Sequence, residues 1–205
     1  DLVHHEKEDP TCTNKGHKAY DTCTRCDYTT YEEIPKLGHI YEDGICTRCG
    51  LELTTSDLLY ELTSDNTGYI VTGLDYSKYD INALTIIIPS EYKGIPIVGI
   101  KEEAFKNRIK IKKVILSDNI TYIGNAAFEG CTRIANIEIP TSVTSIGSSA
   151  FEGCTGLTSI EISTSVTNIG GTAFSGCTGL TSIEIPYSVT SIGSSAFEGC
   201  TGLTS

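Results

Sequence analysis

Cysteine and histidine gather in the N-terminal part of the chain, residues 1–50, which hold five of the nine Cys and all four His. Two identical knuckles stand there, Cys23-Thr-Arg-Cys26 and Cys46-Thr-Arg-Cys49, with residues 27–45 between them. Two thiolates with two residues between them can reach one ion at about 2.3 Å, and two such turns complete a tetrahedron. Because this spacing is typical of a zinc ribbon, the sequence predicts a zinc-ribbon-like module whose metal is structural.

The division of ligands stays open, since Cys12, His39 and His5 also stand at plausible spacings. In one scheme the four knuckle thiolates hold a single ion. In the other, Cys12 and the first knuckle share an ion with His39 or His5, and the second knuckle is completed by the other imidazole. Disulfides and free thiols are the alternatives, although five is an odd number and a C-x-x-C disulfide is more often a redox group. His17 is expected to be a solvated loop residue. The candidate zinc ligands are Cys12, Cys23, Cys26, Cys46, Cys49, His5 and His39.

The rest of the chain is organised by a repeat with a fixed period of about 23 residues. A longer first copy runs over residues 83–110, with extra residues at 91–95. A repeat of this length is typical of a solenoid, in which each coil covers the apolar edge of the next. The sequence therefore predicts three parts: a module over residues 1–50, a linker over residues 51–82 and a series of repeats over residues 83–205. The last of these repeats is incomplete. The later copies open at Ile111, Ile134, Leu157, Leu180 and Leu203.

Within one copy the apolar positions predict the inside of a coil. Alternation over residues 137–139 indicates a short strand with one buried face, and Pro140 ends it. A second extended piece is expected over residues 142–146, followed by a tight helical turn over 148–154. Phe and Cys recur once per copy in the turn, so both should form internal columns, with each Cys acting as a small apolar residue. The columns are Phe128, Phe151, Phe174 and Phe197, and Cys131, Cys154, Cys177 and Cys200.

The pattern IEIPxSVTxIGxxAFxGC resembles the BspA-like class of bacterial leucine-rich repeats, and the match extends over residues 83–205. The resemblance implies a curved parallel-sheet solenoid with short helical or 3-10 turns, in a secreted or surface-anchored protein that attaches to host proteins or other cells. The chain would then be an excerpt of a longer protein. The segment around Cys12 and His39 also resembles a short Cys/His unit of secreted bacterial proteins, which favours a role for both residues.

Two strand-like runs in the linker, residues 58–63 and 69–74, predict a hairpin around the short loop between them. An uncapped solenoid edge invites association, so this hairpin is expected to cover the first coil. Tyr60 and Tyr69 would then pack as cap residues.

The net charge of the chain limits the kinds of molecule that it is expected to bind. The formal net charge is −11, and no Lys or Arg follows Arg133. Nucleic acid and anionic membranes select for basic residues, so neither is expected as a partner. No apolar run approaches the length of about 18 residues that a membrane-spanning helix needs, so no membrane insertion is expected in this segment. The absence of any Met fits a trimmed segment whose targeting signal is elsewhere.

One outward column combines three Glu with neutral neighbours. Like charges on adjacent strands repel, so the column is tolerated and not structurally favoured. One interpretation is structural: the column is a solvated face that discourages aggregation. The other is functional: the column is an acidic stripe that binds a basic protein surface or a cation. The residues are Glu138, Glu161, Glu184, Asn136, Ser159 and Ser182.

No catalytic residue is expected, because repeated positions lack the unique environment that a catalytic group needs. The sequence favours a non-catalytic protein-recognition or adhesion module of an exported bacterial protein. Its alternatives are an architectural spacer and the binding arm of a larger secreted enzyme.

Overall fold

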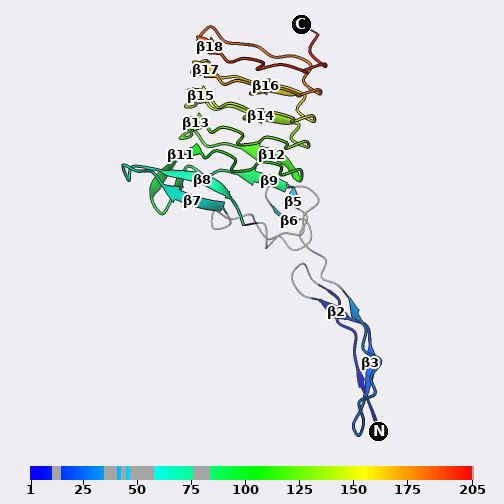
Figure 1. Cartoon of the computed structure of the whole chain (residues 1–205). Helices are drawn as coiled ribbons and strands as arrows, with labels where there is room; N and C mark the ends of the chain where they lie inside the picture. The colour runs from blue at the N-terminus through cyan, green and yellow to red at the C-terminus, as the bar shows by residue number, and fades with distance from the viewer. Residues whose placement is uncertain (11–14, 35–40, 43–44, 47–57, 76–83, 205) are drawn as a thin grey trace.

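The computed structural model describes residues 1–10, 15–34, 41–42, 45–46, 58–75 and 84–204, and every regular element in these ranges is a β-strand (Figure 1). Cys12, His39 and Cys49 lie outside the described residues, as does the side chain of Cys46.

The strands before the solenoid are β1 (Leu2–His5), β2 (Gly16–His17), β3 (Tyr20–Cys23), β4 (Glu33–Ile34), β5 (Tyr41–Glu42), β6 (Ile45–Cys46), β7 (Leu58–Leu62) and β8 (Tyr69–Leu74). Those of the solenoid are β9 (Leu84–Ile87), β10 (Glu91–Tyr92), β11 (Ile95–Ile100), β12 (Ile111–Ile115), β13 (Tyr122–Ile123), β14 (Asn136–Glu138), β15 (Ser145–Ile146), β16 (Ser159–Glu161), β17 (Asn168–Ile169) and β18 (Ser191–Ile192).

Each coil contributes to two parallel sheets (Figure 1). The last coil contributes only an isolated bridge at Glu184 to the first sheet. In the other coils the first strand joins a four-stranded sheet in the order β16-β14-β12-β9. The second joins an eight-stranded sheet in the order β18-β17-β15-β13-β11-β8-β7, with β10 attached to β11. The constant period of the repeat thus places equivalent residues side by side, as in Glu138↔Glu161 and Ser145↔Asn168. The predicted parallel solenoid is confirmed, and its second strand is shorter than the expected 142–146.

The core is a single column of aromatic rings wrapped in branched aliphatic side chains. Phe105 of the longer first copy begins the column, and its ring centroid lies 5.3 Å from that of Phe128. Phe151 and Phe174 continue it at 5.4 Å per step, with planes within 8° of parallel. These four side chains are fully buried, whereas Phe197 at the end of the column is partly exposed. The expected internal column is confirmed.

The third side of each coil is a chain of turns, which corrects the expected helical turn over residues 148–154. Ser149 has φ 55°, a left-handed conformation that no α- or 3-10 helix contains, and Gly153 has φ 69°. Between them the backbone bonds to the next coil, because Phe151 N–H donates to Ala173 O at 2.8 Å. The described residues contain no helix, since inter-coil hydrogen bonds take the donors that a helix would use.

Adjacent coils approach closely where a glycine follows the second strand. Gly170 N–H donates to Ile146 O at 2.8 Å, and a side chain on Gly170 would begin 2.3 Å from the nitrogen of Ser148. Each coil after the first carries glycine at this position, because backbone atoms of the preceding coil occupy the space that a Cβ atom would need. Threonine hydroxyls strengthen the same edge, as Thr167 Oγ1 donates to Thr144 O at 3.2 Å.

The hairpin of β7 and β8 covers the first coil, as the sequence predicts. It extends the eight-stranded sheet, with β8 parallel to β11 and β7 antiparallel at the edge. Tyr60 and Tyr69 pack against the core and against Tyr92, whose ring stacks on that of Tyr60 at 4.1 Å. Tyr92 belongs to the extra residues of the first copy, which form a hairpin of β10 and β11.

The described part of residues 1–50 forms three small antiparallel ladders, β1 with β3, β2 with β4 and β5 with β6. His17 is not a solvated loop residue: it lies in β2, and its ring contacts Tyr20 at 5.1 Å and Tyr31 at 5.7 Å. Its Nε2 is also 3.5 Å from a carboxylate oxygen of Glu8. The expectation failed because β2 and β4 are too short to show a periodic pattern in the sequence.

Candidate functional site

The acidic column lies on the outer face of the four-stranded sheet. Strands β14 and β16 place Glu138 beside Glu161, and an isolated parallel bridge places Glu161 beside Glu184. All three are exposed, and neighbouring strands are about 4.8 Å apart. The alternate positions Asn136 and Ser159 are also exposed and in register. The structure therefore brings the predicted binding residues onto one face.

The column changes character toward the first coil. Val114 pairs with Ile137, which sets Ile115 in line with Glu138, and Ile115 pairs in turn with Ile87. Ile87 and Ile115 are 40% and 39% exposed, high values for large apolar side chains. The same line of positions is thus apolar in β9 and β12 and acidic in β14, in β16 and at the bridge position Glu184.

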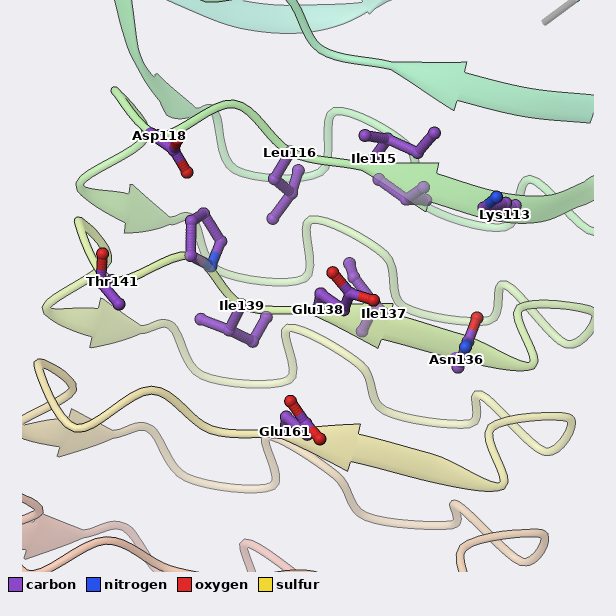
Figure 2. A pocket seen from close by; sticks show the side chains of 12 residues that line it. Lys113, Ile115, Leu116, Asp118, Asn136, Ile137, Glu138, Ile139, Thr141 and Glu161 are labelled. Atoms are coloured by element: carbon purple, nitrogen blue, oxygen red, sulfur yellow. The ribbon is translucent and has the colours of Figure 1, made fainter. Parts of the chain in front are cut away.

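A groove of about 440 Å³ crosses this face where the two halves meet (Figure 2). Its lining comes from three successive coils, with Glu138 and Glu161 in the acidic half and Ile115 in the apolar half. Asn136 also lines it, whereas Glu184, Ser159 and Ser182 lie outside it. The sequence does not predict that neighbouring turns line the groove, and its one signal is the departure from the Glu pattern at Ile115. These further lining residues are Lys113, Leu116, Asp118, Pro140 and Thr141.

The carboxylates of the groove face are available to a ligand. In the part of the chain that the structure describes, Glu138, Glu161 and Glu184 make no ion pair and no side-chain hydrogen bond. By contrast, Glu129 on the turn side of a coil is 3.1 Å from Lys106. A ligand that brings positive charge would relieve the repulsion along the column.

The first predicted knuckle lies at the end of β3. Cys23 Sγ accepts a hydrogen bond from Arg25 N–H at 3.4 Å. The pKa of Cys23 is lowered from its usual value, mainly by a hydrogen bond from the Cys26 thiol and secondly by the bond from Arg25 N–H. His5 lies three ladder positions from Cys23, with its Nε2 3.0 Å from Thr22 Oγ1. His5 and this knuckle are therefore not brought together. Among the described residues no three Cys, His, Asp or Glu side chains form a metal-binding group, and the second knuckle and the other candidates lie outside that set.

The solenoid cysteines form the expected internal column. Each thiol donates to the carbonyl of the Phe in the coil before it, as Cys154 Sγ does to Phe128 O at 3.2 Å and Cys177 Sγ to Phe151 O at 3.2 Å. Burial raises the pKa of Cys131 and Cys177 to about 12 and that of Cys154 further. The thiols are neutral core groups and not nucleophiles.

Stability should therefore fall as pH rises from about 9 toward 12, the interval between the ordinary and the raised thiol pKa. In this window an unfolded thiol has lost its proton while the folded one keeps it, so the unfolded state gains up to about 1.4 kcal/mol per thiol per pH unit. Urea unfolding of wild type and of a Cys131→Ala/Cys177→Ala variant at about pH 8 and about pH 10.5 tests this, because Tyr and Lys titration is common to both. The wild type should lose more stability, and equal losses would contradict the assignment.

The fold and the site define a class: a parallel β-solenoid of leucine-rich repeats that presents a groove across one sheet. The chain belongs to the BspA-type leucine-rich repeat family, since the model of the BspA type Leucine rich repeat region matches residues 79–205 in six copies. Leucine-rich repeat domains of this kind act in protein interaction. The expected resemblance is confirmed for the repeats.

Solved structures agree with this assignment. A leucine-rich repeat protein of T. pallidum is 34% identical with a TM-score of 0.69, over 75% of this chain and 70% of that one. Another from Bacteroides ovatus is 26% identical with a TM-score of 0.59, over 75% of this chain and 46% of that one. This chain thus spans under half of the second relative. No curated protein matches. Among the described residues, no helix has the length and apolar character that crossing a bilayer requires.

Proposed function

We propose that this chain is a non-catalytic recognition module that binds another protein through the outer face of its four-stranded sheet. The observation that carries the proposal is a groove of about 440 Å³ whose lining includes Glu138 and Glu161, two carboxylates that lack a partner among the described residues. A face used only for solvation has no need of a groove that joins three coils.

An exported or cell-surface location and a role in adhesion extend this proposal, and they rest on the family resemblance. A spacer would need no distinctive surface, whereas this sheet changes from apolar to acidic along one line of positions. Catalysis is not proposed, because each coil repeats the polar groups of its neighbours.

Removing charge from the groove should weaken binding. Glu138→Gln/Glu161→Gln should reduce affinity for a bound protein about 2- to 30-fold, since each exposed charge pair contributes about 0.2–1 kcal/mol. The matched control is Glu152→Gln/Glu198→Gln, which removes two carboxylates from the turn side of the coils. Surface plasmon resonance against a panel of extracellular-matrix proteins, at about 50 mM and about 500 mM salt, measures both variants.

Saturable binding that weakens in the groove variant and in high salt supports the proposal. Saturable binding that both variants share would place the site elsewhere. No saturable binding by any member of the panel would favour the spacer.

A second proposal concerns the N-terminal module, for which we propose a structural zinc site. Its support is the bond from Arg25 N–H to Cys23 Sγ, because a backbone donor aimed at sulfur stabilises a thiolate. Cys26 lies at the spacing that lets both sulfurs reach one ion. The remaining ligands would come from the other residues predicted by sequence, Cys12, Cys46, Cys49 and His39.

Metal analysis of purified protein tests the zinc proposal. We expect bound zinc by plasma mass spectrometry, and thiols of residues 1–50 that react only after chelation. Cys23→Ser/Cys26→Ser should lose metal without altering the unfolding of the solenoid. A mass gain of two hydrogens per cysteine pair on reduction would establish disulfides instead, and metal-free protein with reactive thiols would also contradict the proposal.

A further inference from the structure

The outer line of the four-stranded sheet has two chemically different halves. Ile87 and Ile115 make an exposed apolar half, and Glu138, Glu161 and Glu184 make an acidic half. We propose that this face binds an extended segment of a partner protein that carries one apolar side chain and then two Arg or Lys at alternate positions. This inference rests on the proposed function and names the chemistry of its ligand.

The spacing of the sheet sets the spacing of the ligand. Strands about 4.8 Å apart put the three Glu about 5, 10 and 14 Å from Ile115 along the solenoid axis. An extended chain advances about 3.4 Å per residue, so side chains on one face are about 7 and 14 Å beyond the first. The second side chain of the ligand then lies between Glu138 and Glu161, and the third lies at Glu184.

The apolar half of the groove fixes the direction of the segment. Leu116 follows Ile115 in the same coil and lines the groove with it (Figure 2). Pro140 of the next coil also lines the groove, so a Leu or Ile of the ligand would meet more than one apolar side chain. The apolar residue is therefore placed toward the first coil and the basic residues toward the last.

The acidic half favours guanidinium groups in particular. Glu138 and Glu161 are in register one strand apart, so a planar guanidinium can bond to both carboxylates at once. From Ile134 onward the chain has no Lys or Arg that could compete for them. The expected order of preference is Arg over Lys, and either over a neutral residue.

Selection from a library of displayed random dodecapeptides tests the inference. Peptides enriched on the wild-type chain should share an apolar-x-basic-x-basic pattern, and synthetic copies should bind Glu161→Gln/Glu184→Gln at least fivefold more weakly. The second variant is Ile115→Glu, which introduces the residue that later coils carry at this position and so preserves the fold. It should weaken the selected peptides and strengthen a control peptide with basic residues at all three positions.

The outcomes separate the inference from the function on which it rests. Enriched peptides without the pattern that still depend on these variants would overturn the inference and leave the binding face in place. Peptides that bind all variants equally would count against both. Failure to enrich any peptide, while a matrix protein binds the groove, would show that a folded surface and not an extended segment is recognised, which also overturns the inference.

Discussion

Replacing Phe151 by Ala should lower the free energy of unfolding by about 3–5 kcal/mol, the largest loss expected from truncating one side chain of the solenoid. The Phe151 ring is fully buried and lies 5.4 Å from the ring on each side. Its removal leaves a cavity in the middle of the column that neither neighbouring coil can fill without breaking inter-coil hydrogen bonds. Urea unfolding followed by circular dichroism measures the loss.

The matched control for this truncation is Phe197→Ala. Phe197 ends the column, has one described ring neighbour at 5.4 Å and is only partly buried. Its loss should therefore fall below about 3 kcal/mol. Equal losses at the two positions would show that the stability of a coil does not depend on neighbours on both sides, contrary to a stacked solenoid.

The second large effect is expected at Gly170. Gly170→Ala should destabilise the chain by about 3 kcal/mol, the upper part of the usual range for overpacking. Its Cβ would lie 2.3 Å from the nitrogen of Ser148 and 2.5 Å from the carbonyl carbon of Gly147, and backbone cannot rotate away as a side chain can. The coils would have to separate, which weakens the bond from Gly170 N–H to Ile146 O.

The adjacent Gly171 provides the control, because a Cβ there meets nothing closer than Ser194 O at 3.4 Å. Gly171→Ala should change stability by less than about 1 kcal/mol, since an ordinary contact replaces open space. Other coils carry Ser148 and Ser194 at this step, and both are accommodated. Thermal unfolding of the two variants side by side checks the prediction, and comparable losses would contradict the argument from backbone spacing.

The solenoid was predictable because its information is local and repeated. A constant period specifies which side chains share a column, and alternation around residue 137 specifies which face is buried. The turn over residues 148–154 was not predictable, since the stretch Ser-Ser-Ala-Phe-Glu before Gly153 fits a helical turn equally well. Stacking decides it, because Phe151 N–H finds a carbonyl in the next coil and Ser149 adopts a left-handed φ of 55° to permit this.

The candidate site, like the fold, was predictable from the sequence only in part. The acidic column around Glu138 and Glu161 followed from register, which a repeat specifies. The groove did not, because it depends on how Leu116 and Pro140 of adjacent turns border the sheet. For the N-terminal module the ligand set stays a prediction from spacing, and the structure places His5 in a stack with Tyr20 at 4.4 Å.

By itself the sequence determined a linear core, the columns that run through it and an acidic outer face, because each follows from one pattern applied coil after coil. Only the tertiary structure decided the turns and the groove. Both depend on hydrogen bonds and contacts between coils that no single repeat contains, so they exist once neighbouring coils have stacked.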